Sequence, residues 1–98
     1  MSNTFQMEFK QYERDAEILD VLGEVTCLLI VRELIVRGPL SASELSAAID
    51  VSNSIVLQHL QKLNEVEIVI CERKGLKIYC RVEDKKIIKI IQILGLLN

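Results

Sequence analysis

Apolar residues recur along this chain at helical spacing in most segments and at strand spacing in one short stretch. The helical spacing over residues 10–22 and 25–37 predicts an amphipathic helix followed by a nearly fully buried one. Gly38-Pro39 ends the second helix. Residues 1–9 show no such pattern, and we expect them to form a flexible start of the chain.

Capping residues divide the middle of the chain into two further helices. Residues 41–44, Ser-Ala-Ser-Glu, form an S-x-x-E capping box, which predicts a short helix over residues 42–49. Asp50 stands where the chain must turn sharply, and aspartate tolerates left-handed backbone geometry better than most residues. Ser52 is placed to cap a helix that ends near Glu65. Two helices with so short a turn between them form a helix-turn-helix.

The last third of the chain predicts a β-hairpin and one more helix. Residues 68–72 and 77–82 have strand character, with Gly75 in the turn between them. Asp84 caps a final helix over residues 85–97. The predicted fold is therefore mainly α with a small β-hairpin (α+β). It is a single winged helix-turn-helix domain, in which four helices, two strands and a final helix follow one another.

The final helix carries isoleucine and leucine around most of its circumference. A helix of this kind needs cover on several sides, and a 98-residue chain has little other structure to provide it. We therefore expect residues 85–97 to be a dimerisation helix that a second subunit covers. The alternative is that the helix packs wholly within its own chain.

Charge and hydropathy limit the classes of function. A formal net charge of -2 excludes a sequence-blind DNA coat protein, whose affinity comes from neutralising phosphates. A sequence-specific binder needs only local charge, and residues 73–81 carry four basic side chains and no acidic one. No apolar run approaches the ~18 residues that span a bilayer. The first ten residues do not resemble a secretory signal, so we expect a cytoplasmic protein without membrane contact.

The helix-turn-helix and the hairpin together resemble the ArsR family of winged-helix repressors. Residues 40–49, LSASELSAAI, and residues 51–63, VSNSIVLQHLQKL, are similar to the family's typical LSVSELAEALGLSQSTVSRHLKVL. Residues 73–82, RKGLKIYCRV, look like the family's REGRRVYYRL. The resemblance implies a homodimer, joined through the first and last helices, that represses by binding a pseudo-palindromic operator in double-stranded DNA. Two-fold symmetry then places the two reading helices about one DNA turn apart.

Several positions depart from the family pattern. Gln58 replaces the arginine of the reading helix, and Leu57 replaces a neighbouring serine. Residues 39–49 contain no cysteine, and no His, Asp or Glu follows Asp84, so the ligands of the family's two usual metal sites are missing. His59, the only histidine, is no metal site without nearby thiolates, and we interpret it as a packing or phosphate-contacting residue. We expect neither a metal nor a cofactor.

DNA contacts are predicted on the second helix of the helix-turn-helix and on the hairpin. Free N–H groups at the start of that helix favour a phosphate. Gln58 can pair with adenine, and Leu57 can rest on a thymine methyl group. The basic residues hold phosphates, which position the protein without specifying sequence. The predicted contacts are Ser52, Asn53, Ser54, Leu57, Gln58, Gln61, Lys62, Arg73, Lys74 and Lys77.

Two other interpretations of this polar surface stay open. In the first, the polar face of the helix is merely solvated. In the second, the winged helix is a protein-interaction module that uses the same surface for a protein partner. The net acidity, exposed Leu57 and the missing arginine motivate the second alternative. No nucleophile stands in a recognisable catalytic arrangement and no glycine-rich phosphate loop exists, so we do not expect an enzyme.

The cysteines add a possible redox chemistry. If Gly75 and Leu76 form a two-residue loop, Cys71 faces Cys80 as a non-hydrogen-bonded pair, which is the closer kind. The two thiols can then form a disulfide that stiffens the hairpin and couples redox state to DNA affinity. The alternative, which we favour, is two small buried hydrophobic side chains, since buried free cysteine is usually structural. Cys27 is expected in the core.

Overall fold

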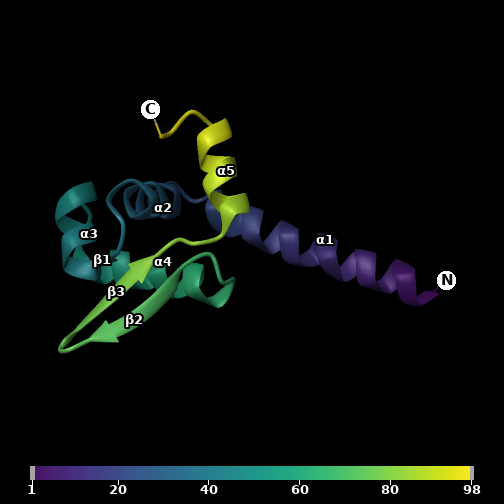
Figure 1. The fold of residues 1–98 in the computed structure, drawn as a ribbon, viewed down its shortest axis with the longest axis horizontal. Coiled ribbons are helices and arrows are strands. Elements are labelled where there is room, and N and C mark those ends of the chain that lie inside the picture. Colours follow the sequence, from purple (N-terminus) through teal and green to yellow (C-terminus); the bar gives the residue numbers. More distant parts are fainter. Residues whose placement is uncertain (1, 98) are drawn as a thin grey trace.

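The computed structural model describes residues 2–97, with side chains from Met7 onward. The elements are α1 (Ser2–Leu22), α2 (Val25–Arg37), β1 (Leu40–Ser41), α3 (Ala42–Ile49), α4 (Asn53–Glu65), β2 (Ile70–Lys74), β3 (Lys77–Arg81) and α5 (Lys85–Ile93). This arrangement of helices around a small antiparallel sheet confirms the predicted winged helix-turn-helix fold (Figure 1).

Local capping signals set the helix-turn-helix as predicted. The backbone N–H of Glu44 donates to Ser41 Oγ at 3.3 Å, and the N–H of Ser41 donates to Glu44 Oε1 at 3.1 Å, so the capping box is complete. Asp50 ends α3 in the left-handed conformation, with φ 55° and ψ 48°. The apolar faces of α2, α3 and α4 then meet in an aliphatic core. Its fully buried side chains include Ile30, Val31, Leu34, Leu45, Val56 and Leu63.

The sheet has the strand order β1-β3-β2, and its hairpin has the predicted register. Gly75, with φ 65°, supplies the left-handed turn, so Lys74 opposes Lys77. Strand β2 starts at Ile70 and not at residue 68, because Glu67 turns with φ 62° and the next two residues enter the core. The third strand, β1, was not predicted, since two residues carry no periodic signal.

Both terminal helices differ in length from the prediction. The apolar pattern begins at Lys10, whereas α1 begins at Ser2, because residues 2–9 contain no glycine or proline to stop the helix. The predicted helix to Leu97 ends at Ile93 instead, because Gly95 adopts φ 77°. Its N–H donates to the Gln92 carbonyl at 2.9 Å, and the Leu96 N–H donates to the Ile91 carbonyl at 3.2 Å. These two bonds are a Schellman motif, with glycine at its usual position.

Helix α1 projects away from the rest of the molecule, and α5 stands against its C-terminal end (Figure 1). One face of α5 is buried in the chain through Ile87 and Ile91, while Ile93 is 75% exposed. On α1, Tyr12 is 74% and Leu19 is 59% exposed. The chain therefore covers part of the final helix and leaves apolar surface on both terminal helices. None of the described helices combines the length and hydropathy needed to cross a membrane.

Candidate DNA-contacting surface

Helix α4 presents its polar face to solvent because its opposite face is anchored in the core. Val56, Leu60 and Leu63 are buried, and Ser52 Oγ accepts the N–H of Ile55 at 3.4 Å to cap the helix. Six of the predicted contact residues are exposed on this helix or its cap: Ser52, Asn53, Ser54, Leu57, Gln58 and Gln61. Leu57 is 54% exposed, an accessibility that both a thymine methyl and a protein partner can use.

Leu57 and Gln61 also line a shallow groove of about 230 Å³ between α4 and the wing, which is the hairpin of β2 and β3. Ile78, Cys71 and Cys80 of the wing line the same groove. The exposed face of α4 and the wing are therefore neighbours on one surface. The structure brings together the two regions that the sequence assigned to DNA contact.

Lys62 is the one predicted contact residue on α4 that lies in an ion pair. Its Nζ atom lies 3.1 Å from Oε1 and 3.3 Å from Oε2 of Glu24, the residue that precedes α2. The hydrogen bond from Lys62 lowers the pKa of the Glu24 carboxyl. Lys62 must leave this pair, or share it, before it can hold a phosphate. No local sequence signal connects two residues 38 positions apart.

The positive charge of the wing is concentrated at its tip. Arg73, Lys74 and Lys77 are exposed, and no ion pair involves them among the described residues. Arg81, at the base of the wing, instead lies 2.7 Å from both Glu72 and Glu83. Hydrogen bonds to these two carboxylates, chiefly Glu83, raise the pKa of Arg81. Three tip cations, and not the four basic residues of this stretch, are therefore available to phosphate.

A disulfide joins Cys71 of β2 to Cys80 of β3. The two residues are directly paired across the strands, and their Cα atoms are 4.1 Å apart. Our preference for two unlinked buried cysteines is therefore wrong. The physical reason is the register: a two-residue turn places both thiols on one face in a closely spaced pair.

Cys27 is fully buried in the core, as predicted, but it lies close to His59. The thiol of Cys27, the imidazole of His59 and the carboxylate of Glu24 have donor atoms within 4.8 Å of one another. The premise that His59 has no thiol nearby is therefore wrong, because packing of α2 against α4 joins segments distant in sequence. Burial, reinforced by the Glu24 charge, raises the pKa of Cys27 to about 11.

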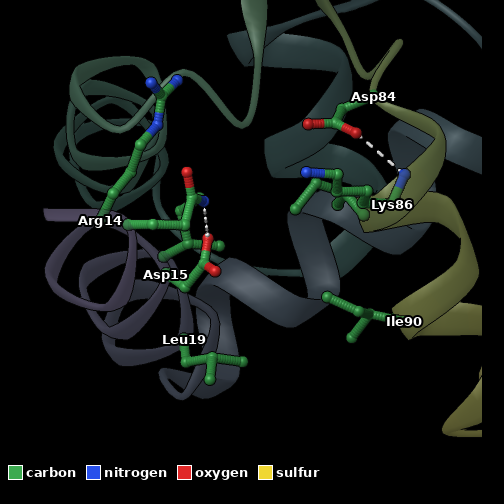
Figure 2. Close-up of a pocket in the computed structure, with 9 residues that line it drawn as sticks. Arg14, Asp15, Leu19, Asp84, Lys86 and Ile90 are labelled. Carbon is green, nitrogen blue, oxygen red and sulfur yellow. Dashed lines mark hydrogen bonds between the residues drawn. The ribbon is translucent and has the colours of Figure 1, made fainter. Parts of the chain in front are cut away.

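A second cavity, of about 510 Å³, lies between the first and last helices. Figure 2 shows Arg14, Asp15 and Leu19 of α1 across this cavity from Lys86 and Ile90. Its wall is apolar in places and charged in others, and it adjoins the exposed apolar residues of α1. This is the region that the resemblance assigns to subunit contact.

The fold and these residues have counterparts in known proteins. The family model described as "Bacterial regulatory protein, arsR family" matches residues 26–70. The transcriptional repressor PagR of Bacillus anthracis is 30% identical over 90 residues, which make up 92% of this chain and 90% of PagR. The chain belongs to the ArsR family. As an ArsR-family protein it is a DNA-binding transcription regulator and not an enzyme.

Solved structures of relatives have the same fold. The crystal structure of PagR matches with a TM-score of 0.80 at 30% identity, covering 88% of this chain and 98% of PagR. NolR from Sinorhizobium fredii matches with a TM-score of 0.80 at 26% identity, covering 91% of this chain and 88% of NolR. The repressor BigR from Xylella fastidiosa matches with 0.79 at 26% identity, covering 91% of this chain and 90% of BigR.

Proposed function

We propose that this ArsR-family protein is a homodimeric repressor that reads a pseudo-palindromic operator with α4 and grips the operator's phosphates with the wing. The observation that carries the proposal is the shared surface: the capped, exposed face of α4 borders the same groove as a wing with three unpaired tip cations. Its relatives PagR and BigR are transcriptional repressors, which supports repression. Action on operator DNA places the protein in the cytoplasm.

Dimerisation through α1 and α5 completes the proposal. Exposed Tyr12, Leu19 and Ile93 lie on helices that the chain covers only in part. Burying them against a second copy removes apolar surface from water, which stabilises the dimer. A second copy also places two reading helices for two half-sites. Sedimentation of the wild type and of Leu19→Glu tests this, and a monomeric wild type at micromolar concentration contradicts it.

The direct experiment measures binding to duplex DNA from the promoter upstream of the protein's own coding sequence. In the test variant, Arg73, Lys74 and Lys77 are replaced by Ala. We expect affinity to fall by more than ~10-fold at physiological salt, because phosphate contacts dominate such binding. The charge-matched control replaces Lys10, Lys85 and Lys89, which are exposed and lie outside α4 and the wing. These residues are on α1 and α5, so sedimentation first confirms that the control assembles like the wild type, and it then keeps near-wild-type affinity.

Two outcomes count against this function. Failure of the wild type to bind any such promoter DNA at low salt contradicts operator binding. Equal losses of DNA affinity in the test and control variants contradict a specific role of the wing in DNA binding. The alternative function, a protein-interaction module, gains support if an apolar protein partner still binds the variant that lacks the tip cations. The 54% exposure of Leu57 is the observation that favours this alternative.

We further propose that the wing senses thiol redox state. The disulfide is the specific observation, since disulfides in cytosolic proteins are usually transient, catalytic or redox-sensing. Oxidation joins the two Sγ atoms, releases two protons and passes two electrons to a peroxide or a second disulfide. Strand β2 is an edge strand held only by β3, and it carries Arg73 and Lys74. Reduction removes the covalent link and leaves β2 joined to β3 only by their backbone pairing, which loosens the wing and so weakens its contacts with phosphate.

Redox control is tested by measuring DNA affinity with and without reductant. We expect the reduced wild type to bind more weakly than the oxidised form. Cys71→Ser/Cys80→Ser should match the reduced form and ignore reductant, whereas Cys27→Ser should keep the redox response. Identical affinities of the oxidised and reduced wild type end the redox proposal but leave operator binding intact.

A further inference from the structure

Three side chains of different chemistry converge where the start of α2 meets α4. Glu24 Oε2 lies 3.3 Å from His59 Nε2 and 3.7 Å from Cys27 Sγ. All three donor atoms lie within 4.8 Å of one another. Cys27 is fully buried, while Glu24 and His59 are partly exposed, so the cluster is closed on one side and open on the other.

We propose that Glu24, Cys27 and His59 form a binding site for a tetrahedral divalent metal ion of the Zn²⁺ type. Zinc binds thiolate at about 2.3 Å and imidazole or carboxylate at about 2.0–2.2 Å. Tetrahedral angles at those lengths put neighbouring ligand atoms roughly 3.4–3.6 Å apart. The Glu24–His59 and Glu24–Cys27 separations already lie close to that spacing. A water molecule on the open side supplies the fourth ligand.

The orientation of His59 supports the site independently of these distances. Its Nδ1 lies 2.8 Å from the Ile55 carbonyl oxygen, one turn earlier on α4. The carbonyl oxygen accepts, so Nδ1 carries a proton, and Nε2 is the ring nitrogen that faces the Glu24 carboxylate. Nε2 and Glu24 Oε2 lie 3.3 Å apart, close enough for one metal ion to bind both atoms. Metal-binding histidines are commonly held by such a hydrogen bond to a backbone carbonyl.

Charge and second-shell contacts also fit a divalent ion. A thiolate and a carboxylate together balance its two positive charges. Glu24 Oε2 faces Cys27 and His59, while Lys62 Nζ lies 3.1 Å from Oε1 and 3.3 Å from Oε2. When Oε2 ligates the metal, Lys62 gives up its contact with Oε2 and keeps the one with Oε1. Binding replaces the thiol proton of Cys27, which leaves to solvent as the metal–sulfur bond forms.

The site is distinct from the family's two usual metal sites, whose ligands this chain lacks in residues 39–49 and after Asp84. It joins α2 to the reading helix itself, since His59 belongs to α4. The site does not depend on the proposed operator binding, because its ligands are present in the free chain.

The test uses the full-length protein in the Cys71→Ser/Cys80→Ser background, where Cys27 is the one thiol. Co²⁺ is titrated while the sulfur-to-cobalt charge-transfer absorption is recorded, and Zn²⁺ affinity is then measured against a chromophoric chelator. We expect one ion per chain and a thiolate absorption band. Loss of an outer-shell partner weakens metal sites by ~10–100-fold, so loss of the direct ligand in His59→Gln should weaken binding at least as much.

Two further variants make the result specific. Cys27→Ser should abolish the charge-transfer band, and Glu65→Gln, an exposed carboxylate elsewhere on α4, should leave binding unchanged. Circular dichroism confirms that each variant is folded, and the partly exposed His59 keeps the test valid if Cys27→Ser is unstable. Absence of a thiolate band, or unchanged Zn²⁺ affinity in His59→Gln, overturns the proposal.

Discussion

The Cys71–Cys80 disulfide closes a loop with a sequence separation of 9 residues across the wing. Cross-linking lowers the entropy of the unfolded chain, and the loop-closure relation gives about 2.5 kcal/mol for a loop of this length. Because Cys80 is buried in the core and β3 also pairs with β1, unfolding of the wing is coupled to that of the domain. Replacing both cysteines by serine should therefore lower the free energy of unfolding by up to about 2.5 kcal/mol.

Urea unfolding at a fixed protein concentration, with and without reductant, measures this difference. For a domain of this size each kcal/mol moves the melting temperature by about 4–8 °C, so in thermal unfolding reduction should lower the melting temperature by up to about 10–20 °C. The serine variant should melt at the temperature of the reduced wild type and show no response to reductant. An oxidised wild type no more stable than the reduced one would refute the coupling of the wing to the core.

Three further predictions concern caps and reading. Ser41→Ala removes the N-cap of α3 and should destabilise the domain by ~1 kcal/mol in urea unfolding, whereas exposed Ser43→Ala should cost less. Hydrogen bonds from the Ser41 backbone lower the pKa of Glu44, so Glu44 stabilises the fold above the ordinary glutamate pKa and loses this effect as pH falls through its lowered pKa. Glu44→Gln should flatten the acid side of the curve of unfolding free energy against pH. An unchanged curve contradicts this role of Glu44. Gln58→Ala should weaken the binding free energy for the specific operator by ~1–3 kcal/mol and change that for random duplex DNA little, as measured by fluorescence anisotropy.

Features with a local cause were predictable from the sequence. The capping box at Ser41, the left-handed Asp50 and the hairpin register around Gly75 each depend on neighbours a few residues away. The neighbouring sequence also indicated where α5 ends, since Gly95 is a strong C-terminal signal. The continuous apolar pattern beyond it favoured a longer helix.

Contacts between distant segments were not predictable in the same way. The pairing of Glu24 with Lys62, and the approach of Cys27 to His59, arise only when α2 packs against α4. For the same reason the sequence overstated the positive charge of the wing, because Arg81 is paired with Glu72 and Glu83 in three dimensions. The candidate surface was predicted residue by residue, whereas the ion pairs and the thiol environment required the fold.

The salt dependence of operator binding tests most directly whether the wing contacts the phosphates of the DNA. Each neutralised phosphate adds about 0.9 to the slope of log affinity against log salt concentration. If Lys74 holds one phosphate in each wing of a dimer, Lys74→Ala should reduce the steepness of this slope by about 2, while Lys85→Ala leaves it unchanged. A slope equal to that of the wild type in Lys74→Ala would contradict the proposal that the wing tip holds the DNA backbone.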